Sequence, residues 1–339
     1  MENGLLLKDY RPESTLRAKR TPIGKGKYPV IDVHNHLKKV FDLDDVIRVM
    51  DEVGVKTIVN LDGGWGETLR NNIDRLDRKY PGRFITFCNL DFALIDDPGF
   101  KAHVRNTIAE GVKYGMGGVK IFKELGLKYR DANGKLVMPD DDRLRVIWET
   151  AAEQNVPVLY HIADPLAFFQ PLSGSNERIE QLTVHPNWSF YGADFPTRDE
   201  LLACQRRMLA KNPQTRFILP HIASNPEDLE HVSELLDTYK NFSVDMSARV
   251  GDLGRQPYTA RKFLIKYADR ILFGLDGGIE PQRYIICFRF LETDDEYFDY
   301  RQPGHNIISR WMVYGVFLPD DVLRKIYYQN ALTVLGLPC

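Results

Sequence analysis

The chain has 339 residues, of which 43% are hydrophobic and 11% aromatic, with a formal net charge of −2 and a pI near 6.5. This composition is typical of a globular protein with a sizeable core. The near-neutral charge gives no electrostatic basis for binding nucleic acid or a membrane surface. The sequence also lacks an apolar run of about 18 residues that would span a bilayer.

The four cysteines, at positions 88, 204, 287 and 339, are scattered and form no C-x-x-C pair. This spacing indicates neither a disulfide framework nor a zinc ribbon, and it fits a reducing compartment. The apolar stretch at the start of the sequence is too short for a signal peptide. We therefore expect a cytoplasmic protein, although a leader already removed would leave no trace.

Residues 1–28 are polar and predict an N-terminal arm, and residues 29–339 are expected to form one domain. From residue 30 onward, short apolar strands alternate with amphipathic helical stretches. The predicted strands are 30–36, 57–62, 84–91, 117–122, 157–161, 216–221, 242–246 and 271–276. The predicted helices between them are 44–53, 67–80, 99–114, 141–154, 198–212, 225–239 and 258–267.

This strict alternation of strand and helix predicts a (β/α)8 TIM barrel. The alternative, an open doubly wound sheet, lacks the Gly-rich phosphate loop expected after its first strand. Two long loops depart from a minimal barrel: 162–197 after the fifth strand and the aromatic-rich 281–317 after the eighth. Long loops of this kind usually build the rim of a barrel active site, and 281–317 could instead pack a subunit interface.

The first strand, Val30-Ile-Asp-Val-His-Asn-His36, ends in His-x-His. Because side chains alternate across a strand, His34 and His36 are expected on one face with Asp32 below them. Ile31 and Val33 should point to the other face, which is expected to be buried. Two neutral imidazoles at the carboxyl end of a strand supply half of a divalent-metal site.

Three further predicted strands end in a polar side chain: the fifth in His161, the sixth in His221 and the eighth in Asp276. Barrel active sites lie on the carboxyl-end face, so all of these residues should face one mouth. Each alone could be a hydrogen-bonded histidine or a capping aspartate. Together with His34 and His36 they predict a functional site, whereas the remaining histidines fall on predicted helices or loops.

Lys120, in Gly117-Gly-Val-Lys-Ile-Phe122 of the fourth strand, is predicted to point into the barrel, because its apolar neighbours should face the helices. A lysine in that position is costly unless it is paired or functional. Three interpretations stay open: an anchor for an anionic substrate group, a carbamylated bridge between two metals, or a buried ion pair with a residue such as Asp62.

The combined pattern resembles the amidohydrolase superfamily, in particular the amidohydrolase-related branch (amidohydrolase family 2), from about residue 28 to 337. The phrases that carry it are Ile31-Asp-Val-His-Asn-His36, Gly118-Val-Lys120, Ile271-Leu-Phe-Gly-Leu-Asp276-Gly277 and Asn330-Ala-Leu-Thr-Val-Leu-Gly336. The resemblance implies that a divalent metal, commonly zinc, is ligated by His34, His36, His161 and Asp276. It implies that His221 is a ligand of a second metal or a catalytic hydrogen-bonding residue. Leu275 departs from the pattern, since many relatives have Thr or Ser there.

Three imidazoles and one carboxylate leave an open position for water on the metal, for which Zn²⁺ is the first expectation and Mn²⁺ or Fe²⁺ are compatible. Zinc lowers the pKa of such a water to about 7. Asp276 could take its proton and deliver it to the leaving group, and His221 could polarise the scissile carbonyl. Candidate substrate contacts are the cations Lys120 and Arg249, the latter with the alternative of a surface arginine, and the aromatic residues Trp65, Tyr191 and Phe168.

The sequence therefore predicts a metal-dependent hydrolase that cleaves a C–O or C–N bond of a lactone, ester or amide. The leading alternative is a metal-dependent decarboxylase of an aromatic or unsaturated carboxylic acid, in which Asp276 would protonate carbon. A third interpretation is a barrel that binds a ligand without turnover. We expect a small-molecule substrate as the partner, no nucleic acid or membrane, and a homodimer as one option.

Overall fold

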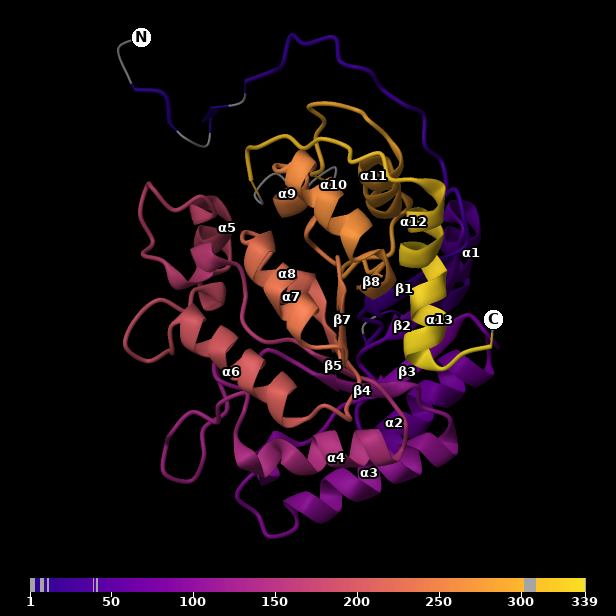
Figure 1. Cartoon of the computed structure of the whole chain (residues 1–339), viewed down its shortest axis with the longest axis vertical. Coiled ribbons are helices and arrows are strands. Elements are labelled where there is room, and N and C mark those ends of the chain that lie inside the picture. The colour runs from indigo at the N-terminus through magenta and orange to yellow at the C-terminus, as the bar shows by residue number, and fades with distance from the viewer. Residues whose placement is uncertain are drawn as a thin grey trace.

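The computed structural model describes residues 4–6, 9–10, 12–38, 40, 42–301 and 309–338. Eight parallel strands follow one another in chain order around a nearly closed barrel (Figure 1). Backbone hydrogen bonds from Val33 N to Phe273 O and from Asp276 N to His34 O bring the last strand next to the first. The predicted TIM barrel is thus confirmed. Its strands are β1 Val30–Asn35, β2 Val55–Asn60, β3 Phe84–Cys88, β4 Gly118–Ile121, β5 Val158–Tyr160, β6 Phe217–Leu219, β7 Phe242–Asp245 and β8 Ile271–Leu272.

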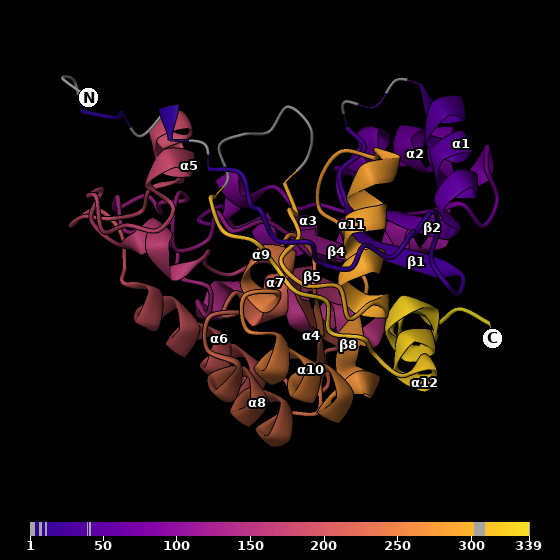
Figure 2. The ribbon, with the colours of Figure 1, turned by 90° about the horizontal axis from the view of Figure 1, so that it is seen from above.

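Helices cover the outside of the barrel, and α6, α8 and α10 form one row along it (Figure 2). The helices that follow the strands are α1 Leu43–Val53, α2 Gly66–Ile73, α3 Phe100–Tyr114, α4 Arg145–Glu153, α6 Arg198–Lys211, α8 Leu229–Thr238, α10 Pro257–Lys266 and α11 Pro281–Glu292. Shorter helices lie in the loops and at the end of the chain: α5 Ile179–Val184, α7 Pro220–Ala223, α9 Val250–Leu253, α12 Asp320–Arg324 and α13 Asn330–Leu335.

Helix α1 shows how local sequence signals set these boundaries. Asp42 caps its start by accepting a hydrogen bond from Asp45 N, and Gly54 ends it with φ 82°, a left-handed conformation that favours glycine. Its buried residues recur at helical spacing, so one face of the helix packs on the barrel.

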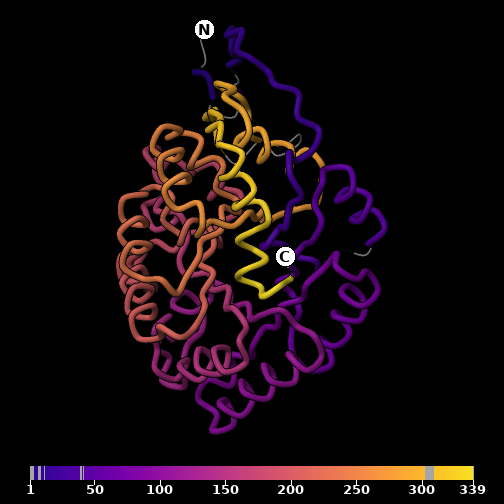
Figure 3. The backbone as a smooth tube through the Cα atoms, turned by 45° about the vertical axis from the view of Figure 1, so that its right-hand side comes forward, coloured from indigo at the N-terminus to yellow at the C-terminus, as the bar shows by residue number. Residues whose placement is uncertain are grey.

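The barrel interior is filled by apolar side chains that come from strands on all sides of it. They are Ile31, Val33, Val59, Leu61, Phe87, Leu159, Ile218 and Leu272, with Ala331 of α13 beside them. Figure 3 shows the C-terminal stretch running close to the first strands. The interior is therefore a packed core, and α13 contributes to one end of it.

The prediction from strict alternation along β1 was wrong for Asp32. Its carboxylate accepts hydrogen bonds from Leu275 N and from the hydroxyl of Tyr284 on α11, and Val33 packs in the interior. The register between β1 and β2 shifts between Asp32 and Asn35. This irregularity lets Val33 and the following His34 both lie inside the barrel.

The described part of the N-terminal arm arches over the top of the barrel (Figure 1), and its residues Lys19 and Thr21 contact the segment that follows α11. Lys19 Nζ donates to Asp294 Oδ1 at 2.5 Å, and the Thr21 hydroxyl donates to Asp295 Oδ1 at 2.6 Å. Cys88, Cys204 and Cys287 are free and buried, and Cys339 lies outside the described residues. Within the described ranges, no helix has the length and apolar character needed to cross a membrane.

Candidate metal centre and cavity

Three imidazole nitrogens surround the carboxylate of Asp276 at the carboxyl ends of the strands. Nε2 of His36 lies 3.5 Å and Nε2 of His34 lies 3.8 Å from Asp276 Oδ1, and Nε2 of His221 lies 3.6 Å from Oδ2. Ligand atoms of His34, His36 and Asp276 all fall within 4.8 Å of one another. The side chains chosen at the ends of β1, β6 and β8 therefore converge on one point.

The backbone around these residues is unusual where it presents them. Residues His221 to Ser224 all have positive φ, between 52° and 59°, as does Asp276 with φ 55°. A left-handed turn of ordinary residues costs about 1–2 kcal/mol per residue. Such conformations persist where the surrounding structure enforces them and cluster at functional sites. Here the turn after β6 aims His221 at Asp276.

A second layer of acceptors orients each imidazole. Nδ1 of His34 donates to Asp245 Oδ2 at 2.9 Å, and Nδ1 of His36 donates to Asp62 Oδ1 at 2.9 Å. Nδ1 of His221 lies 2.8 Å from the carbonyl oxygen of Ser247. Because the proton is placed on Nδ1 in each ring, each Nε2 presents a lone pair, which is the arrangement found around metal-ligating histidines.

Electrostatics support the same protonation states. Burial lowers the pKa of His221 well below its ordinary value, so its ring is neutral. Burial raises the pKa of Asp245, but interactions with His34 and hydrogen bonds from Ser247 outweigh it and lower this pKa to about 2. The pKa of Asp276 is also lowered, because interactions with His34 and His36 exceed the effect of burial. Both carboxylates are ionised at neutral pH.

These donors fit a divalent cation bound between His34, His36 and Asp276. Neutral imidazoles and a carboxylate are ligands suited to Zn²⁺, Mn²⁺ and Fe²⁺. His34, His221 and Asp245 also lie close together. In that group, however, Nδ1 of His34 donates to Asp245 and Nδ1 of His221 donates to the carbonyl oxygen of Ser247. These contacts therefore orient the imidazoles and do not form a second metal site.

His161 lies beside this centre without joining it. Its ring centroid is 4.4 Å from that of His221, but its Nε2 lies 3.4 Å from Asp164 Oδ1. Among the described residues this buried Nε2 has no hydrogen-bond partner. Burial lowers the pKa of His161 to about 4, so the ring is neutral.

Lys120 points into the barrel as predicted, since it pairs in register with Leu159 of the interior core. Its Nζ is buried, has no hydrogen-bond partner among the described residues, and lies 5.2 Å from the ring centroid of Phe122. Burial lowers its pKa to about 8. The ion pair with Asp62, one of the three interpretations, is not formed, because Asp62 accepts from His36 and from Lys38 N.

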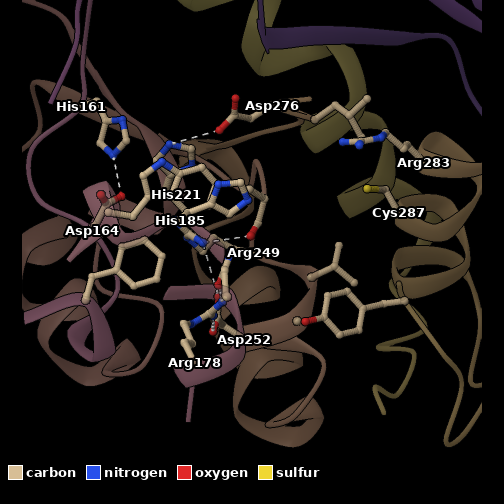
Figure 4. Close-up of a pocket in the computed structure, with 18 of the residues that line it drawn as sticks. His161, Asp164, Arg178, His185, His221, Arg249, Asp252, Asp276, Arg283 and Cys287 are labelled. Carbon is tan, nitrogen blue, oxygen red and sulfur yellow. Dashed lines mark hydrogen bonds and ion pairs between the residues drawn. The ribbon is translucent and has the colours of Figure 1, made fainter. Parts of the chain in front are cut away.

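A cavity of about 690 Å³ opens beside the centre (Figure 4). His161, His221 and Asp276 line it from the strand ends. The loop 162–197 contributes Phe168, Arg178, His185 and Trp188, and the region after β8 contributes Arg283, Cys287 and Tyr300. Both long loops therefore line the cavity, as their position after strands predicted.

The remaining predicted substrate contacts divide into two groups. Arg249 and Phe168 line the cavity. Trp65 and Tyr191 are exposed and are not among its lining residues, and Lys120 is buried and does not line it either. Trp65 stands at the start of α2, where its ring lies 6.2 Å from that of His103 on α3, and its predicted contact with the substrate stays a prediction.

The aromatic residues predicted for 281–317 serve two purposes. Tyr284, Phe288 and Phe290 are fully buried, and the first two pack on Phe273 in the core. Tyr300 lines the cavity. Most of this aromatic cluster therefore stabilises the barrel and does not contact the cavity.

Sequence reasoning missed several residues of the site. Asp245 ends β7, and the rule that found His161 and His221 would also have selected it. Arg178 and Asp164 lie in the long loop, where no periodic signal indicates a direction. Arg283 enters the cavity from the start of α11, and the sequence shows no sign of this.

Comparisons with known proteins agree with this architecture. The family model described as amidohydrolase matches residues 27–337. A search of curated proteins finds no match. Among solved structures, a dihydroxybenzoic acid decarboxylase from Polaromonas sp. JS666 with bound manganese has 17% identity and a TM-score of 0.56, covering 91% of this chain and 97% of that one.

Two other solved structures have similar scores. A 5-carboxyvanillate decarboxylase from Novosphingobium aromaticivorans DSM 12444, complexed with manganese, has 14% identity and a TM-score of 0.54 over 94% of this chain and 100% of that one. A 4-oxalomesaconate hydratase from Rhodopseudomonas palustris has 13% identity and a TM-score of 0.53 over 91% and 95%. At these identities the likeness establishes the fold and not the reaction.

Proposed function

The chain belongs to the amidohydrolase family, and from this membership we propose that it is a metal-dependent enzyme acting on a small organic substrate. The observation that carries the proposal is the carboxylate of Asp276 within 3.5–3.8 Å of three imidazole Nε2 atoms. The proposed ligands are His34, His36 and Asp276. His161 would complete the set if its side chain turned from Asp164 toward Asp276.

A divalent ion held there would act as a Lewis acid, which makes a coordinated water acidic or polarises a substrate oxygen. We propose Zn²⁺ or Mn²⁺. Mixed imidazole and carboxylate donors suit both ions, and manganese is bound in the two decarboxylase structures.

Asp276 is proposed to move the proton during the reaction. Its pKa is lowered, so the carboxylate can accept a proton at neutral pH and return it to a leaving group or a carbon atom. His221 presents a lone pair from Nε2 because its Nδ1 donates to Ser247 O. This tautomer favours His221 as a proton acceptor or a metal ligand over the carbonyl-polarising donor that the sequence suggested.

Hydrolysis of a C–O or C–N bond is the first candidate reaction. Asp276 lies at the cavity wall with 28% of its side chain exposed, so water and substrate can both reach it. Proton transfer by such a carboxylate to a leaving group is the usual step of metal-assisted hydrolysis.

Decarboxylation is the second candidate, and a specific feature favours it. Four cationic side chains, Lys123, Arg178, Arg249 and Arg283, line the cavity against the three carboxylates of Asp164, Asp252 and Asp276. This excess of cations suits an acidic substrate. The similar structures include two decarboxylases of aromatic acids.

A substrate panel tests the proposal. The metal-loaded protein is incubated with lactones, esters and hydroxybenzoates, and acid release and CO₂ release are measured separately. Acid release supports hydrolysis and CO₂ release supports decarboxylation. In either case Asp276→Asn should lower kcat by about 10²–10⁴-fold. If the panel compounds bind to the metal-loaded protein without any product forming, the chain is a binding barrel and the proposal fails.

A further inference from the structure

The cavity has a second polar region besides the metal centre, formed by Arg178, Arg249 and Asp252. Figure 4 shows these side chains together on one side of the cavity and Asp276 on another. Arg178 belongs to the long loop 162–197, whereas Arg249 and Asp252 follow β7. The region is thus built jointly by the loop and the barrel.

A buried ion pair holds the two parts together. Arg178 Nη2 donates to Asp252 Oδ1 at 2.6 Å, with only 5% and 1% of the two side chains exposed. Arg178 Nη1 donates to Gln181 Oε1 at 3.2 Å. These contacts fix the position of Asp252 and leave its Oδ2 without a hydrogen-bond partner among the described residues.

Arg249 is the least satisfied group of this region. Only 9% of its side chain is exposed. Within the described ranges it donates a single hydrogen bond, from Nη1 to Ala248 O at 3.0 Å. Its Nε is buried without a partner, and its Nη1 lies 3.7 Å from Asp252 Oδ2. A guanidinium carries five N–H donors, so most of its hydrogen-bonding capacity is free at the cavity wall.

The charge of the region is not balanced. Three guanidiniums contact Asp252: Arg178 at 2.6 Å, Arg255 at 3.2 Å and Arg249 at 3.7 Å. Glu177 pairs with Arg255 at 2.8 Å and lies 4.0 Å from Arg178, whereas Glu227, the other nearby carboxylate among the described residues, pairs with Arg198 at 3.0 Å. With the Arg198–Glu227 pair neutral, three guanidiniums face two carboxylates among the described residues, which leaves one excess positive charge, and burying an unpaired charge is costly. An anionic ligand would remove this cost.

The wall beside this region is aromatic. The ring of His185 stacks on Trp188 with centroids 4.1 Å apart, and Phe168 lies 6.1 Å from Trp188 on a nearly parallel plane. These residues line the same cavity as Arg249. A flat substrate body can lie against them between the two polar regions.

We propose that Arg249, braced by the Arg178–Asp252 pair, binds a carboxylate of the substrate away from the metal centre. The planar fork of a guanidinium matches the two oxygens of a carboxylate. Since the reacting group must lie at Asp276, the substrate is a bifunctional acid: one group reacts and a separate carboxylate anchors it. This deepens, and rests on, the proposed function.

The test measures carboxylate binding in the absence of metal. The full-length protein is treated with a chelator, and benzoate and its neutral isostere benzamide are titrated by isothermal calorimetry. We expect benzoate to bind at least tenfold tighter than benzamide. Arg249→Gln should abolish that preference, whereas Arg255→Gln, which removes another guanidinium from Asp252 but does not line the cavity, should keep it.

Equal binding of benzoate and benzamide by the wild-type protein would overturn the proposal. So would an equal loss in the Arg249→Gln and Arg255→Gln variants, because the effect would then come from Asp252 and not from contact with the ligand. If Arg249→Gln does not fold by circular dichroism, Arg249→Lys replaces it. Lysine keeps the charge but not the fork, so it should lower benzoate affinity while retaining some preference over benzamide; unchanged affinity would contradict a bidentate contact.

Because no metal is present, this result is independent of turnover. A protein that prefers benzoate through Arg249 but shows no product with any acid would keep the anion site and reject the proposed function. A protein that is active but shows no such preference would keep the function and reject the anion site.

Discussion

Replacing Asp245 by asparagine should weaken metal binding although Asp245 is not itself a proposed ligand. Its Oδ2 accepts the Nδ1 proton of His34 at 2.9 Å, and its Oδ1 accepts from His221 N at 3.1 Å and from Ser247 N at 3.0 Å. Loss of such an outer partner typically lowers metal affinity by about 10–100-fold. At about 1.4 kcal/mol per decade this is roughly 1.4–2.8 kcal/mol.

The same substitution should change the pH dependence of stability. His34 and the hydrogen bonds from Ser247 outweigh burial and hold the pKa of Asp245 at about 2, below the ordinary value of 3.8. A lowered pKa in the folded state stabilises it above pH 4, and this contribution is lost as pH falls from about 4 to 2. At about 1.4 kcal/mol per pKa unit it amounts to about 2 kcal/mol at neutral pH, which Asp245→Asn should remove.

The matched control is Asp32→Asn. Asp32 is equally buried and accepts a hydrogen bond from His34 N at 3.1 Å, but it contacts no imidazole nitrogen. Burial raises its pKa. Metal affinity is measured by competition with a chelator and stability by urea unfolding of the metal-free protein. Wild-type metal affinity in Asp245→Asn, or an equal loss in Asp32→Asn, would refute the role assigned to Asp245.

Three further predictions concern other parts of the chain. Burial raises the pKa of Asp77 from 3.8 to about 6, so between these pH values the folded state holds a proton that the unfolded state has released, and stability falls as pH rises. Urea titrations should show that the free energy of unfolding falls by on the order of 2 kcal/mol over this range and that the fall is absent in Asp77→Asn. Parallel curves for the two proteins would contradict this. Gly274→Ala places a Cβ 3.0 Å from His34 Cβ. This crowding should cost about 1–3 kcal/mol of stability and weaken metal binding. An unchanged melting temperature would contradict it. Trp65→Ala should leave KM within about twofold, because Trp65 lies outside the cavity; a large rise in KM would show that Trp65 reaches the substrate.

Much of the architecture could be predicted from the sequence because the prediction depends on two local signals, the periodicity of apolar residues and the polar residue that ends a strand. Apolar strands alternating with amphipathic helices predict a barrel, and the last polar residue of a strand predicts what faces its mouth. These rules located His34, His36, His221 and Asp276, which the structure brings together.

The prediction that failed for Asp32 depends on irregular backbone. Strict alternation placed Asp32 beside His34, but the register shift that follows Asp32 brings His34 inside the barrel, whereas Asp32 faces Tyr284.

The second polar region of the cavity, formed by Arg178, Arg249 and Asp252, could not be predicted for a different reason. Arg178 meets Asp252 from 74 positions away, and nothing periodic in the loop 162–197 records that contact. Positions of this kind are decided by tertiary packing and need the structure.

The central claim is that His34, His36 and Asp276 hold a divalent metal. The most direct measurement is metal content per chain, by elemental mass spectrometry, for the wild-type protein and for His36→Ala after equal exposure to Zn²⁺ or Mn²⁺. We predict about one equivalent in the wild-type protein and a loss of most of it in the variant. Equal metal content in the two proteins, or none in either, would contradict the claim.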